Sequence, residues 1–248
     1  MMVSVRSGYW DGGFRTLILL VRSKPDMDVA ILGGTGDFGR GLALRLAIDT
    51  DHAVVIGSRD PERGREAAED YRDQLRRHDG NGSIDGTGNS DAAAGAEVVV
   101  CSVPAYHLTD TIESVADALE PGNILVSPAV GMKGDEDGMH YNRPGAGSVT
   151  ALAAGAAPDG VPVVGAFHSL AAGRLADLDA ELGADTLVVG DDEDAVERVV
   201  SLADGIEGLR ALRAGPMANA PEVEALTPLL INLAEYNDDL HDAVVRFD

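Results

Sequence analysis

Three glycines of this chain are spaced for binding a phosphate group. They are Gly34, Gly36 and Gly39, in the pattern G-x-G-x-x-G. Gly34 permits a tight turn, Gly36 lets the backbone approach a pyrophosphate closely, and Gly39 lets a helix and a strand pack together. A helix that begins behind such a turn offers free N–H groups and the positive end of its dipole to the phosphates. The spacing therefore predicts a dinucleotide-binding turn.

A hydroxyl group and two guanidinium groups follow about twenty residues after the glycines. They belong to Ser58, Arg59 and Arg63. A chain that binds NAD usually places a carboxylate at this point, where it accepts a hydrogen bond from the ribose 2′-hydroxyl. Guanidinium groups bind phosphate instead, and no carboxylate occupies the predicted strand end to repel it. These residues therefore favour NADP over NAD.

The elements that must position these residues are predicted on both sides of the turn. Residues 29–32 form an apolar run typical of a buried strand, and apolar positions over 42–47 repeat at helical spacing. A second apolar run over 53–57 ends just before Ser58. The alternative is a glycine turn in an unrelated α/β protein with two surface arginines. The order of strand, turn, helix and strand disfavours it.

Strands and helices alternate along most of the chain. Further strands are predicted over 97–103, 123–127, 162–166, 186–190 and 209–214, and further helices over 61–78, 107–119, 148–157, 192–203 and 221–236. Residues 79–90 and 130–147 are rich in glycine and polar residues, which predicts loops, the second a candidate lid. The alternation predicts an α/β fold, a Rossmann-type doubly wound parallel sheet with a small C-terminal α/β domain.

Three segments are expected along the chain. Residues 27–166 would form the NADP-binding Rossmann domain, and residues 167–248 would form the small domain that completes a cleft over the carboxyl ends of the strands. Residues 1–26 fit neither, because their apolar run over 16–21 is short and carries no signal-peptide cleavage pattern. Met27 immediately precedes the first predicted strand. A mispredicted start codon is therefore the leading account, with a disordered tail or an added edge strand as alternatives.

The charge of the chain is extreme for its size. The formal net charge is -23 at pH 7 over 248 residues, and Lys24 and Lys133 are the only lysines. Such a surface repels nucleic acid and anionic membranes. The acidic residues are spread along the chain and form no tail, which favours a solvated surface suited to high salt over a site for a basic partner. The pattern is similar to that of halophilic archaeal proteins.

The rest of the composition is that of an ordinary soluble protein. The hydrophobic fraction is 45%, and no apolar run has transmembrane length. Cys101 is the single cysteine, which excludes an internal disulfide and a cysteine-cluster metal site, and it is expected to fill space in the core. We expect a cytoplasmic protein with small-molecule partners, no metal, and a homo-oligomeric state with a dimer favoured.

An ordered set of motifs resembles the archaeal NADPH-dependent coenzyme F420 reductases, also called F420-dependent NADP oxidoreductases. The resemblance runs from about Met27 to the C-terminus. Its motifs are Gly33-Gly34-Thr35-Gly36 with residues 39–47, Gly57-Ser58-Arg59, Val126-Ser127-Pro128, Ala166-Phe167-His168, Arg174, Gly190-Asp191-Asp192, Ala214-Gly215-Pro216, and residues 226–229 with Asn232. Membership implies reversible hydride transfer between NADP(H) and the deazaflavin coenzyme F420, which acts as co-substrate.

The resemblance also implies roles for individual residues. By this likeness the pyrophosphate would lie against Thr35, Gly36, Asp37 and Phe38, and the 2′-phosphate against Ser58, Arg59 and Arg63. The nicotinamide half would be bordered by Val103, His107, Val130 and Ala172. His168 would lie beside the stacked rings and help to orient them, while Met217, Asn219 and Ala243 would shape the deazaflavin pocket.

The chain departs from the family pattern at three places. Asp37 stands where the family often has Asn, so a carboxylate is expected near the pyrophosphate, either pointing outward or screened by salt. Ala105 replaces a bulky aromatic residue, which would open the wall beside the deazaflavin. Residues 238–242 replace a glycine-rich stretch, so the assignment of Ala243 depends most on the structure.

The chemistry implied by the resemblance asks little of side chains, because the two cofactors carry the hydride. We therefore nominate no catalytic residue and no proton-transfer pair. His107 would contact a ligand or bond to the backbone, with neither role favoured. A ligand role is favoured for His168 and a structural role for Arg174, which could pair with Asp177. The acids over 191–194 are predicted to cap a helix rather than bind a cation.

Two other functions remain open from the residues alone. One is an NADP-dependent reductase of a small imine or carbonyl compound, which would need a positioned proton donor such as Tyr or Lys. No Tyr-x-x-x-Lys pair is present, which counts against one large class of such enzymes. The other is a non-catalytic NADP-binding sensor. A second large apolar pocket facing the nicotinamide would argue against a sensor.

Overall fold

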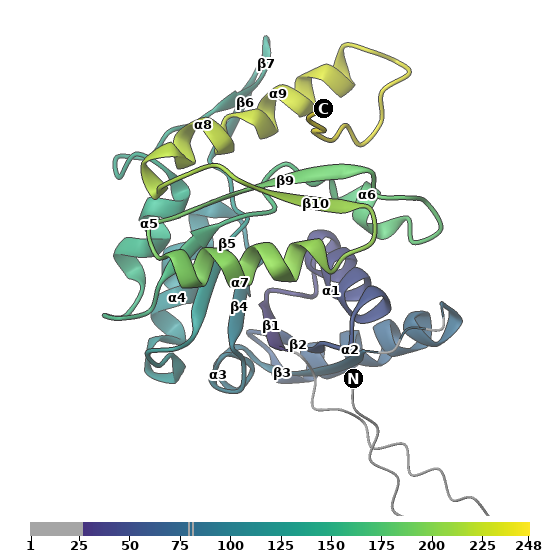
Figure 1. The fold of residues 1–248 in the computed structure, drawn as a ribbon, viewed down its shortest axis with the longest axis vertical. Helices are drawn as coiled ribbons and strands as arrows, with labels where there is room; N and C mark the ends of the chain where they lie inside the picture. Colours follow the sequence, from purple (N-terminus) through teal and green to yellow (C-terminus); the bar gives the residue numbers. More distant parts are fainter. Residues whose placement is uncertain (1–26, 79, 81) are drawn as a thin grey trace, which may run out of the picture.

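A mostly parallel sheet of eight strands forms the middle layer of the molecule, with helices on both faces (Figure 1). The computed structural model describes residues 27–78, 80 and 82–248, so the predictions for residues 1–26 lie outside it. The strands of the sheet are β1 (Asp28–Leu32), β2 (Ala53–Ser58), β3 (Ser83–Gly88), β4 (Val98–Cys101), β5 (Ile124–Ser127), β8 (Val163–Gly165), β9 (Ala184–Gly190) and β10 (Leu209–Arg213).

The helices that cover the sheet follow the strands in alternation, as predicted. They are α1 (Asp37–Asp49), α2 (Pro61–Arg77), α3 (Asn89–Ala94), α4 (Ala105–Ser114), α5 (Val149–Ala156), α6 (Ala172–Ala176), α7 (Glu193–Asp204), α8 (Ala220–Glu224) and α9 (Leu226–Glu235), with short 3₁₀ helices η1 (Ala116–Ala118) and η2 (Met217–Asn219). Two caps follow the sequence prediction. The Asp60 side chain accepts from the Glu62 N–H, and that of Asp192 from the Ala195 N–H.

The strand order is β10-β9-β8-β5-β4-β1-β2-β3. The chain winds outward from β1 through β2 to β3, then returns to β4 on the other side of β1 and winds through β5 to β8. The order reverses between β1 and β4, and ligands of doubly wound sheets bind outside the strand ends at this point. Neighbouring strands are parallel except for the antiparallel pair β8 and β9. The predicted Rossmann-type fold is confirmed.

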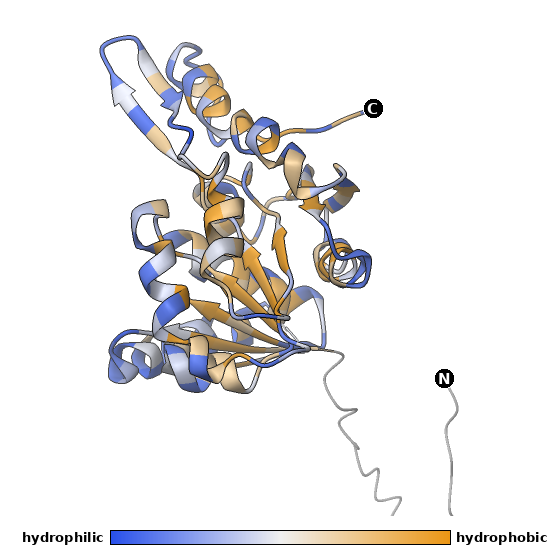
Figure 2. Ribbon diagram, turned by 90° about the vertical axis from the view of Figure 1, so that its left-hand side faces the viewer, coloured by the Kyte–Doolittle hydropathy of each residue, from blue (hydrophilic) through white to orange (hydrophobic). Residues whose placement is uncertain are grey.

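Both faces of the sheet are buried, which explains why its central strands are apolar throughout. Alternate residues of β1 point to opposite faces. Val29 and Ile31 belong to the core cluster under α1, α2, α6 and α7, whereas Ala30 and Leu32 belong to the cluster under α3, α4 and α5. Figure 2 shows the sheet as an apolar layer between helices whose outer sides are hydrophilic. Cys101 is fully buried in the second cluster, as predicted.

The segment predicted as a loop over 79–90 contains β3 and the start of α3, so this prediction is wrong. The sequence of β3, Ser83–Gly88, has no apolar alternation because α2 lies directly on it. A Cβ atom at Gly86 would come 2.0 Å from the Gly64 carbonyl oxygen, and one at Gly64 would come 2.5 Å from that of Thr87. Glycines at this crossing let the helix contact the strand backbone, and they also remove the usual signal of a strand.

The candidate lid over 130–147 is a hairpin rather than an irregular loop. Its strands are β6 (Met132–Asp135) and β7 (Gly138–Tyr141). The hairpin projects from the body of the molecule beside α9 (Figure 1). The Asn232 side chain holds it there, accepting from the Met139 N–H at 2.7 Å and donating to the Met139 carbonyl at 2.8 Å. Hydrogen bonds between this hairpin and the side chain of a distant helix leave no local pattern in the sequence by which the hairpin could be predicted.

The C-terminal part of the chain continues the same sheet. β9 and β10 follow the expected boundary at 166/167, yet they extend the sheet past β8 without a break. The division into two domains therefore stays a prediction. The helix predicted over 221–236 consists of α8 and α9, which meet at Ala225. No helix among the described residues is both long and apolar enough to span a membrane.

Candidate functional site

A groove of three connected cavities runs past the carboxyl ends of the central strands. The first, of about 540 Å³, is called the Arg59 compartment and is lined by Gly33, Thr35, Gly36, Ser58, Arg59, Asp60, Arg63, Asn89, Ser102, Val103, Pro104, His107, Asp110, Thr111 and Ser114. The second, of about 310 Å³, is the His168 compartment, lined by Gly36, Asp37, Phe38, Ser102, Val103, Pro104, Pro128, Ala129, Val130, Met132, His168, Leu170 and Thr227.

The third cavity, the α9 compartment, has about 630 Å³. Its lining residues are Phe38, Ser169, Leu170, Ala171, Ala172, Thr227, Leu230, Ile231, Ala234, Glu235, Leu240, His241, Asp242 and Ala243. The three cavities share walls. Gly36, Ser102, Val103 and Pro104 line both the first and the second, and Phe38, Leu170 and Thr227 line both the second and the third. A long ligand or two adjacent ligands can therefore lie along one continuous path.

The glycine turn at the head of α1 is built for close approach. Gly33 has a φ of +70°, and a Cβ atom there would lie 2.6 Å from Val103 Cγ1. A Cβ atom at Gly39 would lie 2.7 Å from Gly34 Cα, so α1 packs directly against the turn. A Cβ atom at Gly36 would meet only the Gly33 carbonyl, at 3.7 Å, and is otherwise in open space. The backbone at Gly36 thus faces the groove.

The N-terminus of α1 has no side-chain cap. Its N-cap residue is Gly36, and no side chain accepts a hydrogen bond there. The first N–H groups of a helix lack partners within the helix and carry its positive dipole end. The Tyr71 hydroxyl donates to the Gly34 carbonyl at 3.0 Å and holds the turn from behind. An anion such as a pyrophosphate fits this end of the groove.

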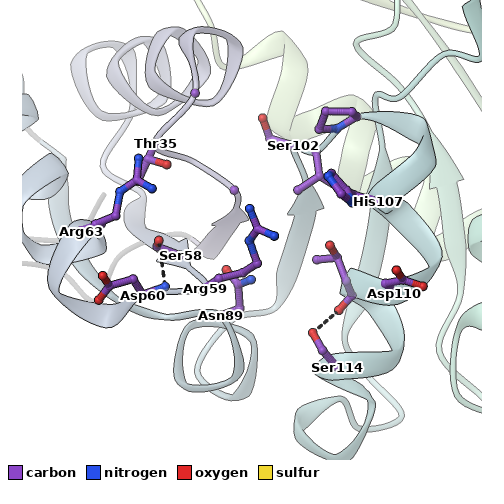
Figure 3. Close-up of a pocket in the computed structure, with 15 residues that line it drawn as sticks. Thr35, Ser58, Arg59, Asp60, Arg63, Asn89, Ser102, His107, Asp110 and Ser114 are labelled. Carbon is purple, nitrogen blue, oxygen red and sulfur yellow. Dashed lines mark hydrogen bonds between the residues drawn. The ribbon is translucent and has the colours of Figure 1, made fainter.

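The Arg59 compartment holds two guanidinium groups that have no carboxylate partner among the residues that the structure describes. None of the ion pairs in the described part of the chain involves Arg59 or Arg63. Figure 3 shows Arg63 beside Thr35, and Arg59 reaching into the cavity between Asn89 and His107. Ser58 lies at the end of β2 between them, and its Oγ accepts from the Asp60 N–H at 3.3 Å. The predicted 2′-phosphate residues therefore line one cavity.

Asn89 also lines this cavity, and its Oδ1 is buried with no hydrogen-bond partner. A buried amide oxygen without a partner is costly, so its place in the cavity is consistent with a ligand donor that completes it. The sequence prediction missed Asn89 because the residue follows β3, which was taken for a loop. Ser102 was missed as well, although its place directly after β4 is a recognisable signal of a ligand contact.

Asp37 lines the His168 compartment and not the Arg59 compartment. It is the first residue of α1, and its side chain is exposed. Val130, which follows β5, lines the same cavity, and Val103 lines both. His107 lines the Arg59 compartment, where its ring is tilted 54° against that of Tyr106. Asp37 was predicted to lie against the pyrophosphate, and Val103, Val130 and His107 to border the nicotinamide half, so His107 lies apart from Val130, in the compartment of the arginines.

His168 is 5% exposed and lies in the turn after β8. Burial lowers the pKa of its imidazole to about 4, so the ring is neutral near neutral pH. Its Nε2 lies 3.4 Å from Thr150 Oγ1, and its Nδ1 is buried with no partner. The His168 carbonyl accepts from the Thr227 hydroxyl at 2.8 Å. A neutral imidazole in this position adds no charge to the groove.

The α9 compartment is mostly apolar and is assembled from distant segments. Ala243, predicted to shape the deazaflavin pocket, lies in its wall. The wall also contains Ala172, predicted to border the nicotinamide half, and Phe38, predicted to lie against the pyrophosphate. Leu170, Thr227 and Leu230 also line it, and the sequence prediction did not single them out. No local motif marks these residues, because only the fold of the C-terminal segment brings them together.

Four predicted site residues line none of the three cavities. Gly34 and Gly39 pack against each other within the glycine turn, and the other two are Met217 and Asn219. Met217 lines a separate cavity with Asp191 and Asp192, and Asn219 donates through its side chain to the Ala214 carbonyl at 2.8 Å. Both follow β10, which is the edge strand farthest from β3, whereas the groove follows the strands around β1. Their expected part in shaping the deazaflavin pocket therefore stays a prediction without support from the groove.

The Cys101 thiol and the Arg174 side chain do not line the groove. Burial raises the pKa of the Cys101 thiol to about 12, so this cysteine carries no thiolate. Arg174 donates to the Leu182 carbonyl at 3.2 Å, a structural contact other than the suggested pair with Asp177. The structure, within the residues it describes, brings no three His, Cys, Asp or Glu side chains together in a way that could hold a metal ion.

The chain is similar in sequence to a known group of proteins. Residues 28–131 match the family model described as NADP oxidoreductase, coenzyme F420-dependent. A protein of Methanocaldococcus jannaschii named F420-dependent NADP reductase is 39% identical over 210 residues, which cover 84% of this chain and 92% of that protein. The protein of the same name from Methanothermobacter marburgensis is 38% identical over equal shares of both chains.

The fold is similar to solved structures as well. A crystal structure from Arthrobacter sp. FB24, named as a candidate F420-dependent NADP reductase, has a TM-score of 0.68 and 27% identity, and the match covers 84% of this chain and 94% of that one. A hypothetical protein from Sinorhizobium meliloti has a TM-score of 0.60 and 24% identity over 78% of this chain and 87% of its own. The second match supports the fold alone.

Proposed function

We propose, because the chain belongs to the family of coenzyme F420-dependent NADP oxidoreductases, that it transfers a hydride reversibly between NADP(H) and the deazaflavin coenzyme F420. The observation that carries the proposal is the continuous groove with two unlike ends. One end offers guanidinium groups and an uncapped helix N-terminus, and the other offers a large, mostly apolar cavity. A dinucleotide and a second flat ring system would each fit one of these ends.

The Arg59 compartment would hold the adenosine half of NADP(H). The backbone N–H groups at the head of α1 would bind the pyrophosphate, and Arg59 and Arg63 would bind the 2′-phosphate with Ser58. Neither arginine has an ion pair to break first among the described residues, so both are available to a phosphate. The unpartnered Asn89 Oδ1 supports this placement, because a ligand donor would satisfy it.

The His168 and α9 compartments would hold the two reacting rings. NADPH and F420 carry the hydride themselves, and the protein must stack the rings, orient them and exclude water. Val103, Val130 and the neutral His168 would border the nicotinamide, and Phe38, Ala172 and Ala243 would border the deazaflavin side of the gap. The small side chain of Ala172 would let the rings approach, which requires about 3–3.5 Å between the reacting atoms.

We also propose an oligomeric state and a cellular environment for the enzyme. A homodimer is supported by the outer face of α9, on which Leu229 and Leu233 are exposed together with Tyr236 just after the helix, with Leu229 at 53% and Tyr236 at 68%. An apolar helix face of this kind is usually covered by a partner. The net charge of -23 supports a salt-adapted enzyme that avoids nucleic acid and membrane surfaces, and the buried thiol of Cys101 suits a cytoplasmic setting.

An absorbance assay tests the proposed function against its two alternatives. Purified full-length protein in multimolar salt is mixed with NADPH and oxidised F420, and the deazaflavin band is followed. We expect bleaching with NADPH and much slower bleaching with NADH. A panel of small imines and carbonyl compounds in place of F420 would reveal the other reductase, through NADPH consumption. Binding of NADPH with no consumption by any acceptor would favour the sensor and would contradict the proposal.

A further inference from the structure

The turn after β8, which lies beside the groove, holds a strained residue. Phe167 is fully buried and has a φ of +65°, a left-handed conformation that side chains other than glycine rarely adopt. Such strain persists only where neighbouring groups fix the backbone from several sides. The next residues of the turn supply walls to the groove. His168 lines the His168 compartment, Ser169 lines the α9 compartment, and Leu170 lines both.

Three threonine hydroxyls fix this turn, each from a different element. Thr186 Oγ1 on β9 accepts from the Phe167 N–H at 2.8 Å. Thr227 Oγ1 on α9 donates to the His168 carbonyl at 2.8 Å. Thr150 Oγ1 on α5 lies 3.4 Å from His168 Nε2. The first two contacts hold the backbone, and the third is the only hydrogen bond to the His168 ring that the structure describes.

Glu224 determines how Thr150 meets the histidine. Its carboxylate is fully buried at the end of α8 and accepts four hydrogen bonds, each of 2.9 Å. Two come from the Val149 and Thr150 N–H groups at the start of α5, one from the Thr150 hydroxyl, and one from the Tyr141 hydroxyl on β7. The carboxylate therefore caps α5, ties the hairpin to α8 and directs the Thr150 hydroxyl at once.

The direction of the Thr150 proton fixes the protonation of the His168 ring. The single hydroxyl proton of Thr150 is donated to Glu224 Oε1, so only lone pairs of Oγ1 are left to face the imidazole. His168 Nε2 must then carry the proton and donate it, which leaves Nδ1 bare. The buried, unpartnered Nδ1 agrees with this tautomer, and burial keeps the ring neutral by lowering its pKa.

We propose that Thr150, oriented by Glu224, is a positioning residue that holds the His168 ring in its Nε2–H tautomer and keeps the turn over 167–170 in the shape that stacks the two substrate rings. The inference rests on the proposed function for the identity of those rings. It adds a role for two residues that line none of the three compartments.

Thr150→Val tests the proposal most sharply, because it removes the hydroxyl and keeps the shape of the side chain and the capping of α5 by Glu224. We expect the kcat for F420 reduction to fall about tenfold, since a small displacement of a ring wall is costly to hydride transfer. The KM for F420 should rise, while NADPH affinity measured without F420 should stay within about twofold, because the turn over 167–170 does not line the Arg59 compartment. Thr150→Ser, which keeps the hydroxyl, should restore most of the activity.

Tyr141→Phe is the matched control. It removes one donor to Glu224 from the hairpin and leaves the Thr150 contact in place. If it lowers kcat as much as Thr150→Val does, the effect is a general loosening around Glu224 and the proposal fails. It fails as well if Thr150→Val matches the wild type in kcat and in KM for F420, or if Thr150→Ser is as impaired as Thr150→Val.

The ring nitrogens of His168 give a readout that needs no turnover. In ¹⁵N spectra of the full chain, His168 should show a protonated Nε2 and a bare Nδ1, and Thr150→Val should mix the two tautomers. A protonated Nδ1 in the wild type would overturn the positioning role even if the enzyme reduces F420. Conversely, absence of F420 reduction by the wild type would refute the proposed function and leave the tautomer result to stand alone.

Discussion

The two ends of the groove are specified in different ways. The Arg59 compartment takes its glycine turn and both of its guanidinium groups from one stretch of about thirty residues, from Gly33 to Arg63, and the rest of its wall from residues 89–114. The α9 compartment takes its wall from Phe38, from 169–172, from α9 and from 240–243, which are segments far apart in the chain. The first end offers charged groups that a local motif fixes, whereas the second offers a mostly apolar wall that only the complete fold assembles.

This difference predicts different responses to perturbation. A compartment built on one strand–turn–helix unit keeps its geometry as long as that unit is folded. A compartment built from several packed segments depends on each contact between them, and its disruption should impair ring stacking before phosphate binding.

Removing salt should have the largest effect. It should act first on the α9 compartment, the end of the groove that is assembled from distant segments. The residues 238–242 include three aspartates, and the Asp242 carboxylate lies against Gly173 of α6, close to the α9 compartment. At a few tens of millimolar salt the Debye length is about 20 Å, so repulsion among acidic groups acts across much of the surface. We expect F420 binding to be lost before NADPH binding, followed by unfolding. Calorimetry and hydrogen exchange at decreasing salt measure both. Full activity and an unchanged melting curve at low salt would refute the halophilic interpretation.

The buried His168 should make stability depend on pH at the assembled end. Its folded-state pKa is lowered from 6.5 to about 4, so between these values the unfolded chain binds more protons and stability rises with pH. The contribution across this window is about 3 kcal/mol. The measurement is the difference in unfolding free energy between wild type and His168→Gln at pH 4 and at pH 6.5. Taking this difference cancels the contribution of the carboxylates, which titrate alike in both proteins. If it does not change with pH, the imidazole is not held neutral by burial.

Ala172→Leu should damage turnover and spare phosphate binding. The larger side chain would narrow the α9 compartment and hold the rings apart, and a displacement of about 1 Å can cost about 100-fold in rate. NADPH affinity should change little, because Ala172 does not line the Arg59 compartment. Single-turnover kinetics and NADPH titration separate the two quantities. Equal losses in rate and in NADPH affinity would show that the two ends are not independent.

Arg59→Ala should damage phosphate binding and spare turnover. Loss of a charge-assisted hydrogen bond to the 2′-phosphate should weaken NADPH binding by about 2 kcal/mol, or about 30-fold, and leave NADH binding nearly unchanged. Arg65→Ala is a suitable control, because Arg65 lies nearby on α2, pairs with Glu62 and does not line the Arg59 compartment. The assignment fails if NADPH and NADH lose affinity equally, or if Arg65→Ala has the same effect.

Deletion of residues 1–26 should have the smallest effect on either end. β1 begins at Asp28 and is paired on both sides, with β2 and with β4, so the centre of the sheet is complete without the segment. We expect the unfolding free energy to change by no more than about 0.5 kcal/mol in the same salt. Insoluble protein, or a much lower unfolding midpoint, would show that the segment belongs to the core.

One end of the groove depends on a local motif and the other on contacts between distant segments, and this difference decided what the sequence could predict. The glycine turn, Ser58, Arg59 and the caps at Asp60 and Asp192 are local patterns, and the structure has each of them where predicted. β3 was missed because its glycines serve the close crossing of α2 and so remove the apolar alternation of a strand. The hairpin β6–β7 was missed because Asn232, about a hundred residues later, holds it in place.

At the assembled end, Ala172 and Ala243 were placed through the resemblance to a family, not through periodicity or spacing. Leu170, Thr227 and Leu230 carry no recognisable pattern, and their place in the groove follows from how α9 packs over the turn after β8. Met217 and Asn219 follow the same family pattern, yet lie beside an edge strand outside the groove. Contacts between distant segments are what a single sequence does not display.

Direct transfer of the hydride between the two stacked rings is the central claim, and isotope transfer tests it most directly. NADPH carrying deuterium at the transferred C4 position is mixed with wild-type protein and oxidised F420 in multimolar salt, and the reduced deazaflavin is examined by mass spectrometry. The account predicts that the deuterium appears in the reduced deazaflavin with no loss to water. Reduced deazaflavin without the label, or protein that binds NADPH and never reduces the deazaflavin, would contradict it.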